Sequence, residues 1–145
     1  MRIHKVLGSL ALVLALGATA ACSDDTKSDT ATAISKADFL TQANALCATF
    51  DQKLDAAQAE VVTEEDQIAV ITDVLVPELR GTLVSIRALG FPEGDEELIS
   101  GLIDQTNAKL DEVAADPSSL LTAEVDPFGE INAQLVDYGL TVCGS

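Results

Sequence analysis

The sequence predicts an all-α fold: a compact antiparallel four-helix bundle held by one disulfide and preceded by a signal peptide and a disordered tether. Three observations predict it. Apolar residues recur at steps of three and four along four long segments. Capping residues, Gly and Pro separate those segments. The β-rich pieces, such as Val61-Val62 and Val74–Val76, are too short to be convincing strands and lie within helical patterns.

Residues 1–21 are typical of a lipoprotein signal peptide. Arg2 and Lys5 precede the apolar run Val6–Leu16, and small residues then lead to Cys22. The apolar run is shorter than the roughly 20 residues that a membrane-spanning helix needs. The stretch Thr19–Cys22 resembles a lipobox, although the first of these positions usually holds Leu, Val or Ile. We therefore expect cleavage before Cys22 and lipidation of its thiol, which would hold the mature protein on the outer face of the cell membrane.

The alternative is cleavage at the A-x-A site Ala18–Ala20 and secretion of a free protein. The count of three cysteines favours lipidation, because modifying Cys22 leaves an even pair, Cys47 and Cys143. Outside the cytoplasm these two are expected to form a disulfide, worth roughly 4–5 kcal/mol for a loop of about 100 residues. A redox or metal-binding pair is disfavoured, because the chain has no C-x-x-C motif and no histidine after the leader.

Without its leader the chain is strongly acidic. Loss of Arg2 and Lys5 leaves 24 acidic and six basic residues, a formal charge of −18. Nucleic-acid binding is therefore disfavoured, because phosphate contacts need clustered Lys and Arg. Residues 22–35 are small and polar and predict a flexible tether, whereas residues 36–145 predict one helical domain.

The first helix is predicted over Lys36–Glu60. Ser35 is its capping residue and Asp38 follows three positions later, a variant of the capping box. One face carries an apolar stripe of Phe39, Ala43, Leu46, Cys47, Phe50, Leu54 and Ala57. The opposite face carries Gln42, Asp51, Gln52 and Asp55.

The second helix is predicted to begin after Thr63 and to stop at Gly90. Its apolar period continues across Pro77, which lacks a backbone donor and clashes with the preceding turn, so we expect a kink there rather than a full turn. Phe91–Gly94 is then a loop. The apolar stripe consists of Ile68, Ile71, Val74, Leu75, Leu79, Leu83 and Ile86.

The third helix is predicted over Asp95–Ala115 and the fourth from Asp126 to Gly139. Pro127 would occupy the first position of the fourth helix, and a connector over Ser118–Val125 would contain a short turn. The third stripe is Leu98, Ile99, Leu102, Ile103, Thr106, Leu110 and Val113, and the fourth is Phe128, Ile131, Leu135 and Tyr138.

Candidate binding residues are few. Phe91 is expected to close the core or to anchor a partner. Arg80 and Arg87 lie seven residues apart on one helix face and are expected to pair with local acids, with an anionic ligand as the alternative. The only histidine, His4, lies in the leader, which removes Ser-His-Asp, Cys-His and the common zinc sites.

Two acidic runs, Glu64–Asp66 and Glu93–Glu97, contain carboxylates of the kind that bind divalent cations. Both lie at predicted helix starts, where carboxylates complement the helix dipole, and neither has the spacing of an EF-hand loop. No metal or cofactor is therefore predicted.

Five stretches carry a resemblance that covers nearly the whole mature domain: Ile34–Phe39, Ala45–Cys47, Val76–Leu79, Leu89–Pro92 with Asp95, and Tyr138–Gly144. In these stretches the chain resembles a loose group of small secreted or lipid-anchored proteins from actinobacteria. The resemblance implies a helical fold and supports the disulfide. It implies no chemistry, because that group has no assigned activity.

The sequence thus predicts a lipid-anchored extracytoplasmic helical domain, a binding or adaptor module of the cell envelope without catalytic activity. The alternative is a carrier of a small apolar ligand in an inter-helical cavity. We expect a monomer, held at the membrane by its lipid, with an envelope protein as its candidate partner.

Overall fold

The computed structural model describes residues 33–145, which form an all-helical bundle with no strand among them. The predicted leader and residues 22–32 of the predicted tether, including Cys22, lie outside the described residues. The elements are α1 (Lys36–Gln58), α2 (Glu64–Val70), the π-helical turn η1 (Ile71–Leu75), α3 (Val76–Ala88), α4 (Glu96–Ala115), α5 (Ser118–Thr122) and α6 (Gly129–Tyr138).

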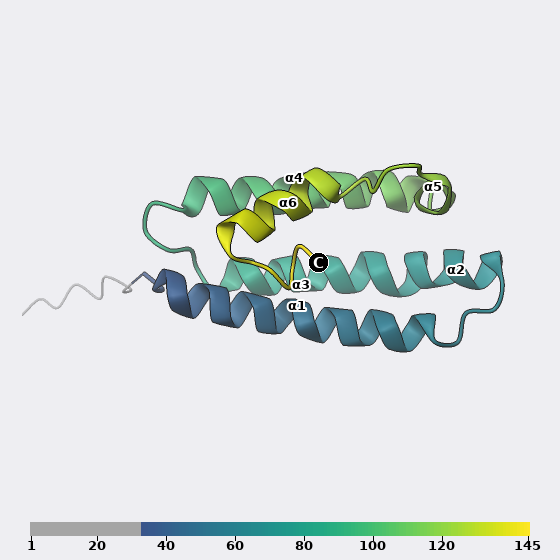
Figure 1. The fold of residues 1–145 in the computed structure, drawn as a ribbon, viewed down its shortest axis with the longest axis horizontal. Helices are drawn as coiled ribbons and strands as arrows, with labels where there is room; N and C mark the ends of the chain where they lie inside the picture. The colour runs from purple at the N-terminus through teal and green to yellow at the C-terminus, as the bar shows by residue number, and fades with distance from the viewer. Residues whose placement is uncertain (1–32) are drawn as a thin grey trace, which may run out of the picture. The chain divides into compact units, whose positions relative to one another are not determined.

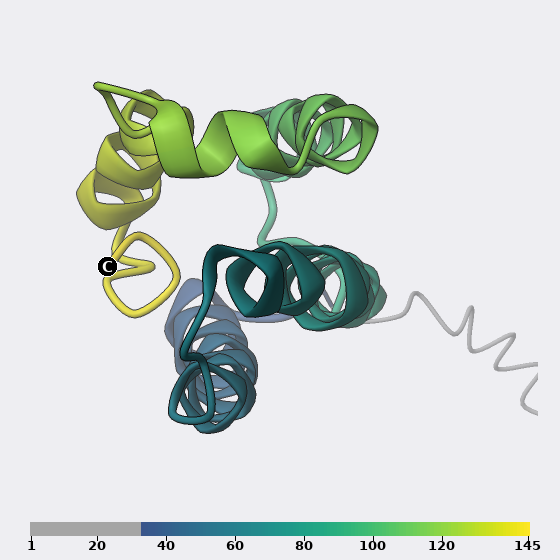
Figure 2. The same ribbon diagram turned by 90° about the vertical axis from the view of Figure 1, so that its right-hand side faces the viewer.

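The helices of residues 33–145 stack in two layers. Helix α3 runs back along α1, α4 runs back along α3, and α6 runs back along α4 (Figure 1). The end view places α1 and α3 in one layer and α4 and α6 in the other, with the short α5 lying across the second layer (Figure 2). The C-terminal segment after α6 descends between α6 and α1 (Figure 2).

Helix α1 begins as its sequence predicts. The Ser35 hydroxyl accepts a hydrogen bond from the Asp38 backbone N–H at 3.1 Å. Of the predicted stripe, Phe39, Ala43 and Cys47 are buried. The placement of Asp51 on the opposite, polar face was wrong, because this residue follows Cys47 by four positions and therefore lies on the same face of the helix.

The segment from α2 to α3 is one continuous helical path, as the unbroken apolar period predicts. It begins with a capping box between Thr63 and Asp66. The distortion at Pro77 takes the form of the π-helical turn that precedes it, in which the Val76 N–H bonds to the Ile71 carbonyl five residues back. A wider turn relieves the clash between the proline ring and the carbonyl four residues earlier, so the helix continues.

Two details of the second layer differ from the sequence prediction. Leu98 is 47% exposed, because the buried stripe runs through Ile99 and leaves Leu98 at its edge. Helix α6 begins at Gly129 rather than at Pro127. The reason is that the Asp126 carboxylate accepts from the Phe128 N–H at 2.9 Å and holds the chain in a turn before the helix.

The predicted end of α6 is confirmed. Gly139 has a φ of 111°, which favours glycine, and its N–H bonds to the Val136 carbonyl at 3.0 Å. The following N–H, that of Leu140, bonds to Leu135 at 2.8 Å. This pair of bonds is the Schellman arrangement, and it turns the chain inward so that Leu140 is buried.

The segment after α6 is attached to α1 by a disulfide and by two hydrogen bonds of the Asn44 side chain. Cys47 and Cys143 form the expected disulfide, 96 residues apart with an S–S distance of 2.06 Å. The amide of Asn44 donates to the Gly139 carbonyl at 3.2 Å and accepts from the Val142 N–H at 2.9 Å. The hydrogen bonds of Asn44 were not predicted, because they join residues almost one hundred positions apart in the sequence.

Candidate ligand-binding cavity

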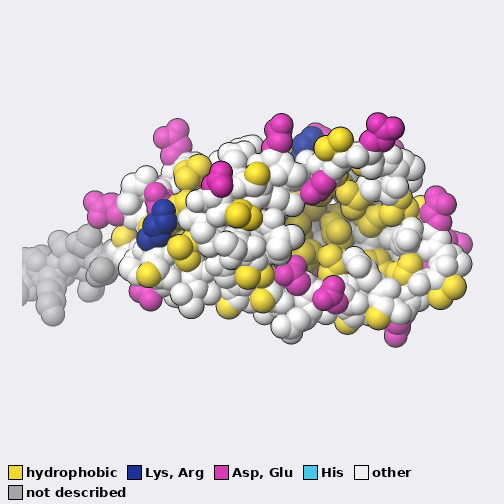
Figure 3. Space-filling model, viewed as in Figure 1, with side chains coloured by type: hydrophobic (Ala, Val, Ile, Leu, Met, Phe, Trp, Pro, Cys, Tyr) yellow, Lys and Arg dark blue, Asp and Glu magenta, His cyan; other side chains and the backbone are white. Residues whose placement is uncertain are grey.

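A difference in helix length leaves the bundle hollow on one side. Helix α6 has 10 residues, whereas α1 has 23 and α4 has 20. At 1.5 Å per residue, α6 is about 15 Å long and the other two are about 30–35 Å long. Helix α6 and the C-terminal segment therefore cover only part of the trough between the layers. Figure 3 shows the uncovered part as a depression lined by apolar side chains, with acidic side chains close to it.

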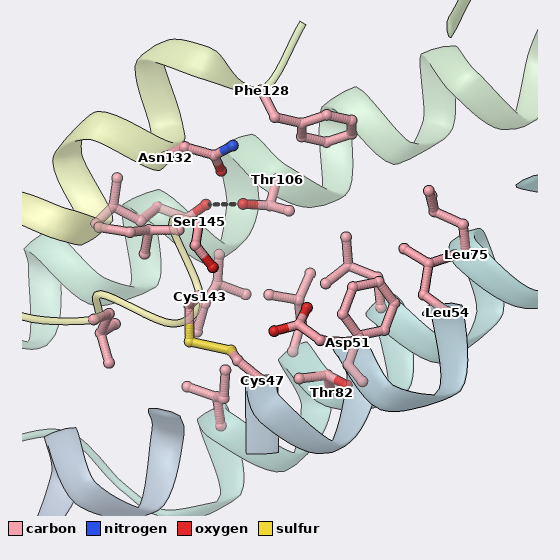
Figure 4. A pocket seen from close by; sticks show the side chains of 18 of the residues that line it. Cys47, Asp51, Leu54, Leu75, Thr82, Thr106, Phe128, Asn132, Cys143 and Ser145 are labelled. Carbon is pink, nitrogen blue, oxygen red and sulfur yellow. Dashed lines mark hydrogen bonds between the residues drawn. A yellow bond between two sulfur atoms is a disulfide. The ribbon is translucent and has the colours of Figure 1, made fainter. Parts of the chain in front are cut away.

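The central cavity lies at this depression and has a volume of about 170 Å³. Fourteen of its 20 lining residues are apolar or cysteine, and none is Lys or Arg. Its walls come from α1, η1, α3, α4, α6 and the C-terminal segment, and the Cys47–Cys143 disulfide lies at one side (Figure 4). The apolar walls are Phe50, Leu54, Leu75, Leu79, Leu83, Ile86, Ile99, Leu102, Ile103, Phe128, Leu135 and Leu140.

A second space, the end hollow, adjoins the central cavity. Its volume is about 370 Å³, and it lies between the end of α1, the α2–η1 segment and α5. Leu54 and Leu75 line both spaces, so together they form one apolar tract. The polar side chains of the end hollow are the neutral Gln58 and Gln67.

Most polar groups around the central cavity have a partner within the protein. The Thr106 hydroxyl donates to the Leu102 carbonyl at 2.9 Å, and the Thr82 hydroxyl donates to the Glu78 carbonyl at 3.0 Å. Asp126 accepts from the Phe128 N–H and, at 3.4 Å, from the Asn132 amide. The Ser145 hydroxyl donates to Val142 at 2.8 Å. These groups are therefore largely satisfied without a ligand.

Asp51 is different from the other polar lining residues. Its carboxylate extends from α1 into the space below Thr106 and Asn132 (Figure 4). Burial raises the pKa of this carboxyl, and the negative charge of Asp55 raises it further. Within residues 33–145 no group donates a hydrogen bond to it and no cation pairs with it. The cavity thus combines an apolar interior with a carboxylate, that of Asp51, that has neither a hydrogen-bond donor nor a cation among the described residues.

Phe91, predicted either to close the core or to anchor a partner, lies half-buried against the core. Its ring meets that of Phe39 edge to face with centroids 6.1 Å apart, and Phe39 meets Tyr138 in the same way at 6.4 Å. The Tyr138 hydroxyl donates to Asp95 at 2.7 Å, and the Lys36 ammonium lies 4.0 Å from the centre of the Tyr138 ring. These residues close the end of the bundle at which α1 begins.

Arg80 and Arg87 lie on α3 and pair with carboxylates of α4, as expected. Arg80 binds Asp111, and Arg87 binds Asp104 with an N–O distance of 2.7 Å. Neither arginine lines the central cavity or the end hollow. Their guanidinium groups are therefore engaged away from the candidate site.

The two acidic runs serve the helix starts in the described structure. Asp66 accepts from the Thr63 N–H at 2.8 Å, and Glu96 accepts from the Gly94 N–H at 2.8 Å. No group of three or more potential metal ligands gathers anywhere in residues 33–145. In the same range, no helix has the length and apolar character needed to cross a membrane.

Comparisons of the chain with protein families, with curated proteins and with solved structures find no match. The candidate site therefore rests on its geometry alone. The residue that sequence reasoning missed is Asp51, and its spacing from Cys47 and from Leu54 was the signal that placed it on the buried side of α1.

Proposed function

We propose that this protein is a lipid-anchored, extracytoplasmic binding domain without catalytic activity, and that its central cavity takes a small apolar ligand. In this proposal α1, the α2–α3 segment, α4 and α6 are the four helices of a compact antiparallel bundle. The leader sequence, the lipobox-like stretch before Cys22 and the pairing of the other two cysteines support the anchor and the compartment.

The observation that carries the proposal is the open apolar cavity. A fully packed bundle would have argued against a carrier, and the interior of a folded protein rarely contains a void larger than a water molecule. Engineered apolar cavities of about 150 Å³ bind benzene. A space of about 170 Å³ is therefore large enough for one ring or a short branched chain.

The adaptor role in the cell envelope is the second candidate. It is favoured by exposed apolar residues at the end hollow: Leu121, which lines it, is 37% exposed, and Val62, next to the lining residue Val61, is 87% exposed. Exposed apolar surface beside a hollow is a feature of protein contact sites. Such a partner would be recovered from membranes after crosslinking.

Toluene titration tests the ligand proposal. The chain beginning at Ser23 contains all of the described helices and carries no lipid that would compete. We expect toluene to shift the amide NMR signals of residues around the cavity and to raise the melting temperature. Thr82→Phe fills the cavity and should abolish both effects, whereas Val84→Phe, at an exposed position of α3, should preserve them. Absence of any binding by the unmodified chain would refute the proposal.

The anchor is tested separately by growth with labelled fatty acid. The protein should acquire the label and fractionate with membranes, and Cys22→Ala should abolish both, because no other cysteine precedes the helical domain. Label that persists in Cys22→Ala would contradict lipidation at this residue.

A further inference from the structure

The Asp51 carboxylate lines an apolar cavity and has no cationic partner among residues 33–145. We propose that the central cavity binds a small amphiphilic cation, an apolar ring or chain bearing a protonated amine, and that Asp51 is its counter-ion. The inference rests on the proposed function, because it specifies the ligand of the same cavity.

The charge of the lining favours a cationic ligand. The lining of the cavity contains two carboxylates, Asp51 and Asp126, and no cationic side chain. An anionic ligand would meet repulsion from both, and a neutral apolar ligand would leave the charge of Asp51 partly buried without compensation, which is unfavourable. A cationic head group removes that cost by forming an ion pair.

The two carboxylates differ in their hydrogen-bond partners. Asp126 already accepts from the Phe128 N–H at 2.9 Å and from the Asn132 amide at 3.4 Å. Asp51 has no such donors among the described residues, and the effect of its surroundings is to disfavour its charged form. Asp51 is therefore the group that gains most from an ammonium ion.

The size of the cavity and the partial exposure of Asp51 also suit a small amine. Asp51 is partly exposed on α1, whereas Ile99 and Leu102 of the cavity wall are buried. An ammonium group at Asp51 would keep part of its hydration as the attached ring enters a space of about 170 Å³. A one-ring amine fits both conditions.

Benzylamine and benzyl alcohol form a matched pair of probes, because both carry one ring and the same number of heavy atoms and only the amine is protonated at pH 7. Isothermal titration of the chain beginning at Ser23 should give a dissociation constant roughly five- to tenfold lower for benzylamine. Asp51→Asn should remove that preference and leave the affinity for benzyl alcohol within about twofold. Asp51→Glu should retain the preference.

Asp55→Asn is the control variant. Asp55 is exposed, lies one turn further along α1 and does not line the cavity, so this substitution removes the same charge without removing the proposed counter-ion. It should change the amine preference less than about twofold. Equal losses in Asp51→Asn and Asp55→Asn would overturn the assignment of Asp51 and attribute the preference to the general acidity of the protein.

The outcomes separate this inference from the proposed function. Equal affinities for the two probes, both abolished by Thr82→Phe, would overturn the cationic ligand and leave the cavity as an apolar site. Failure of both probes and of toluene to bind would overturn the proposed function itself.

Discussion

Near the start of α1, Phe39 and Ala43 have no exposed surface, whereas further along the same helix Phe50 and Leu54 remain partly exposed. The first pair belongs to the closed end of the bundle, where Phe91, Tyr138 and the C-terminal segment cover α1. The second pair belongs to the open end, where α6 is too short to cover α1. One apolar stripe thus supplies a core and a cavity wall, and the length of the neighbouring helix decides which.

The largest expected effect compares these two ends directly. Phe39→Ala should lower the free energy of unfolding by about 3–5 kcal/mol, because it leaves a cavity in a packed region. Phe50→Ala should cost less than about 1.5 kcal/mol, because that ring already borders an open space. Urea denaturation followed by circular dichroism measures both. Equal losses would show that the two ends are packed alike.

Removal of the disulfide should have the next largest effect. The double variant Cys47→Ala/Cys143→Ala should lose about 2–4 kcal/mol of unfolding free energy, since the bond closes a loop of 96 residues. A reducing agent should destabilise the unmodified domain by a similar amount and leave the double variant unchanged. A reductant-sensitive double variant would show that another group is responsible.

Asn44→Ala tests the second attachment of the C-terminal segment. Loss of the hydrogen bonds to Gly139 and Val142 should cost about 1–3 kcal/mol. Gln42→Ala, at an exposed position of the same helix, should cost less than about 0.5 kcal/mol. If the two variants are equally stable, the attachment contributes nothing and the disulfide alone holds the segment.

The smallest effect is a pH dependence of opposite sign at the two ends. The Tyr138 hydroxyl, and to a lesser extent Lys36, lowers the pKa of Asp95 at the closed end. The stability from this lowered pKa is present above the ordinary value near 3.8 and is lost as the pH falls through the folded-state pKa. Tyr138→Phe should therefore flatten the acid limb of the stability profile.

Asp51 at the open end behaves in the opposite way. Burial raises its pKa in the folded state. The resulting loss of folding stability is absent below pH 3.8 and develops as the pH rises through the folded-state pKa. Asp51→Asn should slightly raise the melting temperature at pH 7 and have no such effect at pH 3. A lower melting temperature at pH 7 would mean that Asp51 has a stabilising partner.

The sequence was most informative where structure is determined locally. The capping residues Ser35 and Thr63 and the terminator Gly139 placed helix ends within two residues, because each makes hydrogen bonds over three or four positions. It also predicted the disulfide, from the number of cysteines. Leu98 and the start of α6 were misplaced, because the edge of a stripe and a turn at Asp126 depend on neighbouring side chains.

The periodicity of apolar residues alone could not predict where the cavity lies. Apolar residues with a helical period predict which face turns inward, but they carry no information about whether another helix fills the space opposite. That space exists because α6 is short. Asp51, which the sequence pattern placed on the polar face of α1, therefore lines the cavity. A cavity that exists because a helix is too short can be recognised only from the three-dimensional arrangement of the helices.

Cys47 and Cys143 lie on the wall of the central cavity, with Ser145 beside them. A nascent chain therefore cannot present this pocket while residue 143 is still inside the ribosomal exit tunnel, even if α1 has already formed. The wall of the pocket is therefore complete only after all of the described helices have been translated and the C-terminal segment has packed against α1.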